Sequence, residues 1–373
     1  MADNSTFIKD VKVTDFFEID FLDVESNKSG DAITVRYQVN DLTYIHVVDG
    51  GFQATGDKVV EHINKYYGNP TYIDRVVVTH PDGDHAGGLR TVLEKFTIGE
   101  LWMLRPWHYA DEIMDRFSRF SSVENLKTRL KEIYPNLAAL EEIAVEKGIP
   151  IYEPFQGAAI GEFNVMAPSR KRYLDLIVES EQTPESVEEA EKSAMDSISA
   201  ILHEAARRLA SVIRAAWGEE VFSPNETSAE NEMSVVQYAN IAGSKILLTG
   251  DVGRSGLTEA ADFAPQVGLI LPGIDRFQVP HHGSRRNVST EILDRWLGER
   301  LPELSSTNRF TALISSALKD EHHPRNAVVR ALIHRGAGVF STEGKSVCSF
   351  SNSAPTRGWT NATAYTYPEE QES

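Results

Sequence analysis

The sequence predicts an α/β sandwich, and three observations support this fold class. Short apolar runs bounded by Gly, Asp or Pro recur along the whole chain, which is the pattern of strands. Segments with helical periodicity lie between these runs in both halves, and this alternation is typical of helices layered on sheets. The chain has 373 residues, enough to bury a sizeable core. We therefore expect a single large domain, residues 1–373, with helical outer layers.

The expected strands fall into two groups, one in each half of the chain. In the first half the apolar runs cover residues 32–39, 44–51, 75–80, 100–104, 149–155 and 162–168. In the second half they cover residues 233–239, 245–251, 276–284, 310–316, 336–342 and 346–351. Helical periodicity covers residues 57–68, 290–301 and 324–336, the last with Pro near its start and Gly at its end.

Two helical stretches interrupt this alternation, at residues 105–147 and 169–230. In the second, residues 184–217 repeat apolar side chains at helical spacing, which predicts one unusually long helix with a polar outer face. We interpret both stretches as helical insertions in the single domain. Two roles stay open for them, additional scaffold or a docking surface for a partner chain. The acidic end, residues 367–373, is expected to be a frayed tail.

Composition and charge exclude several classes of protein. The formal net charge is −18, from 55 acidic and 37 basic side chains, whereas a protein that coats nucleic acid non-specifically is basic. The single cysteine, Cys348, excludes an internal disulfide and a cysteine-based zinc site, and it suits a reducing cytoplasm. The first residues show no signal-peptide pattern, and the apolar run VGLILPGI is too short to span a bilayer. We expect a cytoplasmic protein with no membrane segment.

The stretch VVVTHPDGDHAGGLR, residues 76–90, carries the main functional signal. His80 ends a run too apolar to face water, Asp82 and Asp84 lie in a turn, and His85 opens a helix. An Asp-Gly-Asp turn or a histidine at a strand end is, by itself, more often structural. Together these four donors would cost several kcal/mol on burial without a compensating cation. Their spread around the turn favours two adjacent metal ions.

Further donors follow other apolar strands. Asp251 ends KILLTGD, and the pair His281 and His282 follows FQVP. Asp49 ends YIHVVD, where it can orient a ligand histidine from behind. His323 precedes a helix in the run HHPRN. All of them lie just past the carboxyl end of a strand, where α/β sheets place their chemistry.

These motifs resemble a known family. THPDGDHAGGL resembles the signature of the metallo-β-lactamase superfamily, and within it the likeness is greatest to the hydrolase domain of ComEC-type DNA-uptake competence proteins. HPDGDH, LLTGD, PHHGS and HP occur in the order typical of that group, at residues 80–85, 247–251, 280–284 and 323–324. The likeness covers most of the chain outside the helical stretches 105–147 and 169–230.

The resemblance implies an αββα four-layer sandwich with two divalent ions, Zn²⁺ or Mn²⁺ with Mg²⁺ also compatible, at one edge. The ligands it implies are His80 and Asp82 for one ion, Asp84 and His85 for the other, Asp251 as the bridge, and a histidine of PHHGS to complete the second site. We expect that histidine to be His281, which directly follows Pro280, with His282 close behind. His323 would approach the substrate.

Two positions depart from the superfamily pattern. Asp82 stands where a second histidine is usual, a feature shared with the competence-type branch. No histidine lies at a strand end between His85 and Asp251, since His108 and His203 fall in helical stretches. Ser234 or Asn231 occupies that part of the chain. We therefore expect an oxygen-rich first site that favours harder ions such as Mn²⁺ or Mg²⁺ alongside Zn²⁺.

The function that the resemblance implies is hydrolysis of a phosphodiester, with DNA as the expected substrate. Asp84 or Asp251 would orient the attacking water, and His281, His282 or His323 would stabilise or protonate the departing oxygen. Ser284 and Arg285, with Arg286, are expected phosphate contacts, and a solvated loop is the alternative interpretation of these residues.

Two other functions stay open: hydrolysis of a small ester, lactone or amide, and a non-catalytic metal-binding module that serves a partner through its acidic helices. The strong negative charge predicts weak activity on DNA in isolation. A partner, such as an ATPase or sensor of a bacterial defence system, would then present the substrate.

Overall fold

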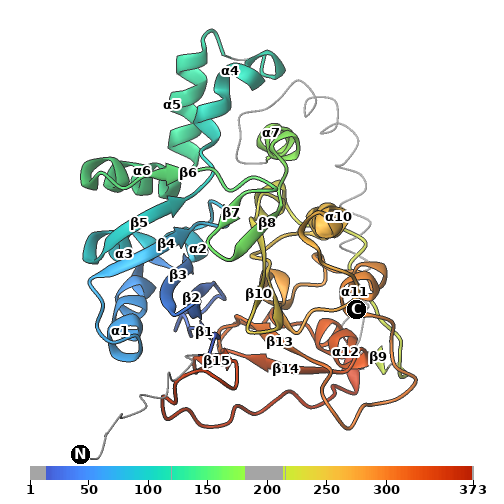
Figure 1. Cartoon of the computed structure of the whole chain (residues 1–373). Coiled ribbons are helices and arrows are strands. Elements are labelled where there is room, and N and C mark those ends of the chain that lie inside the picture. The colour runs from blue at the N-terminus through green and yellow to red at the C-terminus, as the bar shows by residue number, and fades with distance from the viewer. Residues whose placement is uncertain (1–13, 119, 181–212, 215, 372–373) are drawn as a thin grey trace, which may run out of the picture.

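The computed structural model describes residues 14–118, 120–180, 213–214 and 216–371. Two seven-stranded sheets face each other and carry helices on their outer faces, so the expected four-layer α/β sandwich is confirmed (Figure 1). The first sheet has the strand order β15-β1-β2-β3-β4-β5-β6, and the second has the order β14-β13-β12-β11-β10-β8-β7.

The strands of the first sheet are β1 (Phe16–Phe21), β2 (Ala32–Val39), β3 (Leu42–Gly50), β4 (Tyr72–Val77), β5 (Thr97–Trp102), β6 (Ile151–Tyr152) and β15 (Val347–Phe350). Those of the second sheet are β7 (Ala159–Ile160), β8 (Phe163–Ala167), β10 (Val236–Ile241), β11 (Ser244–Leu248), β12 (Arg276–Gln278), β13 (Phe310–Ile314) and β14 (Ala337–Ser341). Strands β3 to β6 pair in parallel, as do β11 to β14.

The helices over the first sheet include α1 (Gly56–Tyr66), α2 (Gly83–Ala86), α3 (Leu89–Lys95), α5 (Val123–Ile133) and α6 (Pro135–Lys147). Those over the second are α10 (Arg254–Phe263), α11 (Thr290–Leu297) and α12 (Asn326–His334). The described residues also contain the α-helices α4 (Ala110–Ile113), α7 (Arg170–Glu179) and α9 (Ala229–Glu232). None of these is long and apolar enough to cross a membrane.

The core has three parts that follow the layers. Apolar side chains of both sheets, such as Phe17, Ile33 and Phe163, meet in the space between them. Successive side chains of a strand point to opposite faces, and inner strands such as β1 and β2 are buried on both of them, one face against the other sheet and one against the helices. The outer face of each sheet packs against its own helices, through residues such as Val76 with Leu93 and Phe277 with Trp296.

Two expectations were wrong. The predicted helix 184–217 does not reach its expected end, because Ile213–Arg214 form strand β9, which pairs antiparallel with β16 (Glu370–Gln371). Residues 184–212 of that prediction lie outside the described residues. The same pairing shows that the acidic end is not frayed at this point, since Gln371 is buried. The backbone N–H and C=O groups of two distant segments form hydrogen bonds with each other here. The periodicity of one segment alone does not predict such a pairing. The stretch 105–147 is helical, as expected.

Candidate metal centre

The candidate centre lies at the edge of the sandwich where parallel strands of both sheets end. His80 comes after β4, Asp251 after β11 and His282 after β12. Because parallel strands present their carboxyl ends at one edge, residues far apart in the sequence meet there. The segment between α2 and α3 packs tightly against the end of β3, and a Cβ on Gly88 would collide with the carbonyl oxygen of Gly50. The Gly-Gly pair of the motif therefore permits this close approach.

Asp251 lies at the middle of the cluster. Its Oδ1 is 3.4 Å from Nε2 of His85, and its Oδ2 is 3.7 Å from Nε2 of both His281 and His282. The same Oδ2 is 3.9 Å from Nε2 of His80. The predicted donors of three separate segments are thus brought together around one carboxylate.

The two aspartates of the turn lie on different sides of this cluster. Asp82 Oδ2 is 3.7 Å from His80 Nε2, whereas Asp84 Oδ2 is 3.9 Å from His282 Nε2. Ligand atoms of Asp84, His85 and His282 all lie within 4.8 Å of one another. Asp82 is thus next to His80, whereas Asp84 is next to His282.

Several buried donors of the cluster have no hydrogen-bond partner. Among the described residues, no hydrogen-bond partner is found for Nε2 of His80, His85 and His282 or for Oδ1 of Asp251. Buried polar atoms of proteins are almost always paired, because an unpaired one costs free energy. Imidazole nitrogens and a carboxylate oxygen are ligands of divalent transition metals. The cluster therefore fits a cation better than it fits an ordinary hydrogen-bonded core.

Asp49 and Thr79 contact Nδ1 of His85 and His80, respectively, so that Nε2 of each ring faces the cluster. Oδ2 of Asp49 is 2.9 Å from Nδ1 of His85, and the same carboxylate accepts hydrogen bonds from the backbone N–H and the hydroxyl of Thr79. The Thr79 oxygen is in turn 2.9 Å from Nδ1 of His80. Asp49 thus lies behind His85, a candidate ligand, at the position after a strand where it was expected, whereas no sequence motif indicates Thr79.

The pair His281 and His282 has a strained backbone. Their φ angles are 47° and 55°, in the left-handed region that residues other than glycine rarely adopt. Strain of this kind is concentrated at functional sites. Nδ1 of His282 donates to the carbonyl of Ser315 at 2.8 Å, so Nε2 carries the lone pair that faces Asp84 and Asp251.

His281 is held differently. Its Nδ1 lies 3.0 Å from Oδ1 of Asn287 and 3.2 Å from Nδ2 of Asn231. The side chain is 26% exposed, against 4% for His282. The geometry therefore favours His282, rather than the expected His281, as the partner of Asp84 and His85.

Electrostatics couple the members of the cluster. Burial alone would raise the pKa of Asp251, but His85, His282 and His281 hold that pKa well below its usual range. Burial would lower the pKa of His85, but the carboxylates of Asp251 and Asp49 raise it well above its usual range. For Asp31, a carboxylate that the sequence analysis missed, burial raises the pKa to about 6.

Asp31 and Asp320 are the two carboxylates near the centre that no motif indicates. Asp31 Oδ2 lies 3.7 Å from His85 Nδ1 and accepts a hydrogen bond from Gln278. Asp320 lies 3.2 Å from Nδ1 of His323, whose ring stacks on His281 at 5.5 Å. Each is an isolated aspartate in a loop, so only its contacts with residues far away in the sequence indicate a role for it.

Other predicted residues lie apart from the ligand atoms. Ser284 is buried, and its hydroxyl accepts the backbone N–H of Arg286, while the carbonyl of Arg285 accepts a hydrogen bond from Arg254. Ser234 accepts the backbone N–H of Asp251, so it positions that residue.

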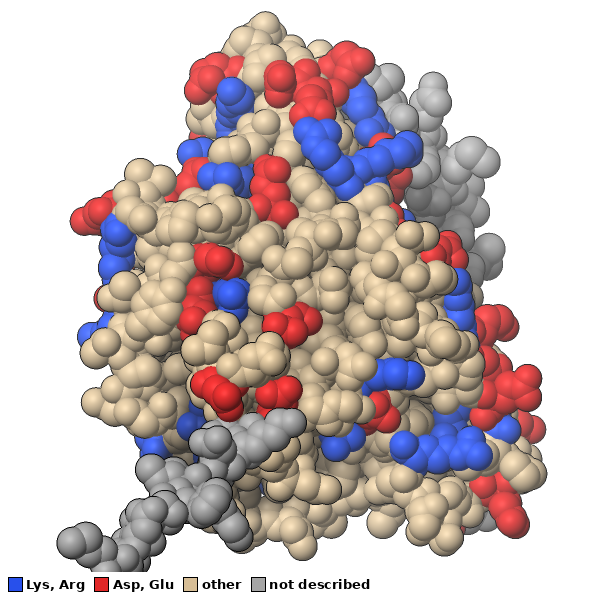
Figure 2. Space-filling view, in the orientation of Figure 1, with Lys and Arg blue, Asp and Glu red and all other residues tan. Residues whose placement is uncertain are grey.

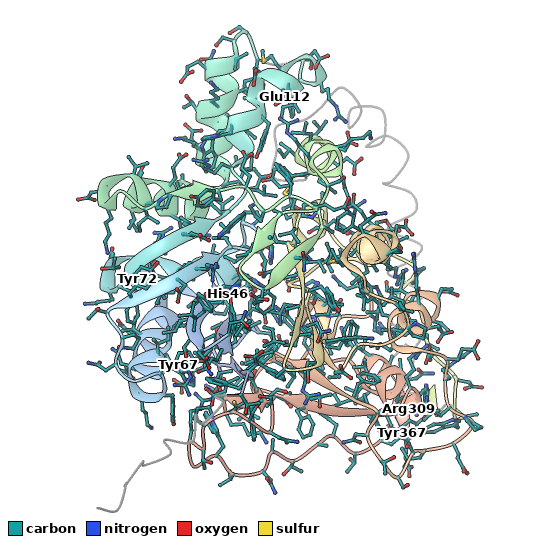
Figure 3. All side chains as sticks on the ribbon, in the orientation of Figure 1. His46, Tyr67, Tyr72, Glu112, Arg309 and Tyr367 are labelled. Carbon is teal, nitrogen blue, oxygen red and sulfur yellow. The ribbon has the colours of Figure 1, made fainter. Side chains whose placement is uncertain are left out.

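Two further histidines lie outside the cluster. His108 is 3.1 Å from Glu141 in the helical stretch. His46, labelled in Figure 3, lies between the sheets beside Gln237, and burial lowers its pKa to about 3. His203 lies outside the described residues.

Comparisons with known proteins found a family match over part of the chain and remote likenesses to solved structures. Residues 41–147 match the family model of the metallo-beta-lactamase superfamily. One similar solved structure is the hydrolase AbOPH of the beta-lactamase superfamily, with 10% identity and a TM-score of 0.28, covering 59% of this chain and 56% of that one. Another is a mutant of the CmlA beta-hydroxylase, with 10% identity and a TM-score of 0.37, covering 89% of this chain and 53% of that one.

The chain thus spans about half the length of either structure. No curated protein matches the sequence. The match to the metallo-beta-lactamase superfamily covers residues 41–147, and the two packed sheets with outer helices are consistent with the fold of that superfamily.

Proposed function

We propose that this protein is a metal-dependent hydrolase that uses two divalent cations to cleave phosphodiesters. The observation that carries the proposal is a set of buried imidazole nitrogens, on His80, His85 and His282, that face the Asp251 carboxylate and have no hydrogen-bond partner in the part of the chain that the structure describes. Two divalent ions bound there would supply an activated water at neutral pH and neutralise charge on the reacting group.

The geometry suggests how the ligands divide between the ions. Asp84, His85 and His282 would hold one ion, and His80 and Asp82 the other, with Asp251 between them. His281 would complete the second of these sets, because its Nε2 faces the same Asp251 oxygen as His80 does, and Asn287 fixes its ring through Nδ1. In this assignment the histidine pair serves both ions, and no mid-chain histidine is needed.

His323 is the proposed proton donor to the departing oxygen. Its Nδ1 is held by Asp320, which also accepts hydrogen bonds from the N–H and hydroxyl of Ser29. The side chain is 22% exposed beside His281, so Nε2 is placed to meet a substrate that approaches the cluster. A proton held at this position can be delivered as the bond to phosphorus breaks.

DNA is the proposed substrate because the motifs resemble those of ComEC-type hydrolase domains. Hydrolysis of an uncharged ester, lactone or amide is the second candidate. The charge favours this second candidate, since the chain carries 55 acidic and 37 basic side chains. On the face shown in Figure 2, Lys and Arg are interspersed with Asp and Glu and do not form a continuous band for a phosphate backbone.

The test is an assay of the purified chain with Mn²⁺, Mg²⁺ or Zn²⁺ on plasmid DNA, a nitrophenyl phosphodiester and a nitrophenyl ester. The comparison variant is Asp84→Ala/His85→Ala. The matched control is His108→Ala/Asp111→Ala, which removes the same residue types from the helical stretch away from the cluster.

Phosphodiester cleavage that the first variant loses and the control keeps would support the proposal. Ester turnover without phosphodiester cleavage would support the second candidate. If the wild-type chain binds no divalent ion and turns over none of the substrates, both are wrong.

A further inference from the structure

A second candidate site lies away from the metal centre, in a cavity of about 920 Å³. It is partly open and is lined by residues of α1, β13, β14 and β15 and by residues 359–363, and none of the described residues that line it belongs to the histidine and aspartate cluster. Its volume lies in the range of small-molecule sites, about 300–1,000 Å³. A single inorganic ion would leave most of this space empty.

One wall of the cavity is aromatic. The rings of Tyr66 and Trp359 are stacked, with centroids 5.1 Å apart and planes at 27°, and His62 lies 6.3 Å from Trp359 at 25°. A flat aromatic wall of this kind suits a planar ring.

Buried charges hold this wall in place. The guanidinium of Arg357 lies 5.2 Å from the ring centroids of both Tyr66 and Trp359. It donates to both carboxylate oxygens of Asp20 at 2.7 and 2.9 Å, and its side chain is only 5% exposed. Tyr67, labelled in Figure 3, also donates to Asp20, at 2.6 Å. A wall fixed in this way loses little conformational entropy when it binds a ligand.

The charge of the cavity is opposite to that of the chain. Its lining contains Lys58, Lys65 and Lys345 against one carboxylate, Glu61, whereas the whole chain has 37 basic and 55 acidic side chains. Lys58 pairs with Glu25 at 2.7 Å. Lys345 is exposed and makes no ion pair within the described residues. A local excess of lysine in an acidic protein indicates an anionic ligand.

We propose that this cavity binds a nucleoside phosphate, with its base against Tyr66 and Trp359 and its phosphate near Lys345. The aromatic wall accounts for a planar base, and the lysines account for the negative charge. An inorganic anion would make no stacking contact with the rings, and an uncharged planar ligand would make no ion pair with the lysines. The inference uses no residue of the metal centre and does not depend on the hydrolase proposal.

The test is calorimetric titration of the full-length Asp84→Ala/His85→Ala chain in EDTA, so that metal-bound phosphate does not contribute. Adenosine 5′-monophosphate, adenosine and inorganic phosphate are titrated separately at physiological salt. The same titrations use Lys345→Glu and Trp359→Ala in that background. Lys171→Glu, an exposed lysine on α7, is the matched charge control.

We expect one saturable site for the monophosphate, with adenosine and phosphate each at least tenfold weaker. Lys345→Glu should weaken binding at least tenfold, and Lys171→Glu should not. Because Lys345 is exposed, this variant decides the question even if Trp359→Ala fails to fold. The proposal is wrong if the monophosphate does not saturate, if phosphate alone binds equally well, or if both lysine variants weaken binding equally.

Discussion

Oδ2 of Asp49 lies 2.9 Å from Nδ1 of His85, and both side chains are fully buried. The carboxylate accepts the ring N–H and so leaves Nε2 of His85 directed at Asp251, 3.4 Å away. Carboxylates in this position set the orientation and basicity of a ligand histidine. This pair therefore links the end of β3 to the candidate metal centre.

Replacing Asp49 by Asn should weaken metal binding by about 10–100-fold, because an amide supports the His85 ring less well than a carboxylate does. The φ angle of Asp49 is 58°, a conformation that Asn tolerates, so the fold should be kept. Competition titration with a metal indicator measures the change. Asp74→Asn is the control, since Asp74 also accepts a backbone N–H, that of Ile45, and is not part of the cluster. Unchanged affinity in Asp49→Asn would contradict the prediction.

Replacing either His281 or His282 by Ala should abolish binding of one of the two ions. If His281 shares an ion with His80, then His281→Ala/His80→Ala still binds one ion, whereas His281→Ala/His85→Ala binds none. Elemental analysis after dialysis counts the ions, and the Mn²⁺ electron paramagnetic resonance spectrum distinguishes a coupled pair from an isolated ion. A His281→Ala chain that retains two ions would show that His281 is not a ligand.

Asp320→Asn should lower kcat by about tenfold and leave KM nearly unchanged, because Asp320 positions His323 and does not touch the substrate. His323→Ala should lower kcat by about 100-fold, the lower end of the range for a general acid. Steady-state kinetics on a nitrophenyl phosphodiester measure both. Glu321→Gln, the exposed neighbour, is the control. Equal loss of kcat in Glu321→Gln, or a change confined to KM, would exclude the positioning role.

Acid should remove the stabilisation that Glu220 provides. Burial would raise the pKa of Glu220, but hydrogen bonds from His334 and Arg335 lower it from 4.5 to about 2. A carboxyl group whose pKa is depressed on folding stabilises the fold above its unfolded pKa. That contribution is therefore complete above about pH 4.5 and is lost as the pH falls towards 2.

Glu220→Gln should cost about 3 kcal/mol of unfolding free energy at pH 7, because Arg335 is fully buried beside it. The cost should shrink as the pH falls towards 2. Denaturant unfolding at pH 7 and pH 3 measures both values. Glu132→Gln, which breaks an exposed pair with Arg129, should cost less than about 1 kcal/mol. A cost for Glu220→Gln that is the same at both pH values would refute the linkage.

The sequence alone determined the layered α/β fold and the segments that carry the candidate site. Strands such as β2 coincide with the apolar run 32–39, because alternation along a strand is a local property. Pro81 and Gly83 likewise mark locally the start of α2, which has Asp82 as its N-cap and Asp84 in its first turn.

Only the tertiary structure decided which side chains act together. Asp320 meets Ser29 across 291 positions, and β9 meets β16 at the far end of the chain. The tertiary structure also gives His281 and His282 different hydrogen-bond partners, because strained backbone angles turn one ring towards Asn287 and the other towards Ser315. Such pairings form when the packing of the two sheets brings distant loops together, so the spacing of residues within one segment does not predict them.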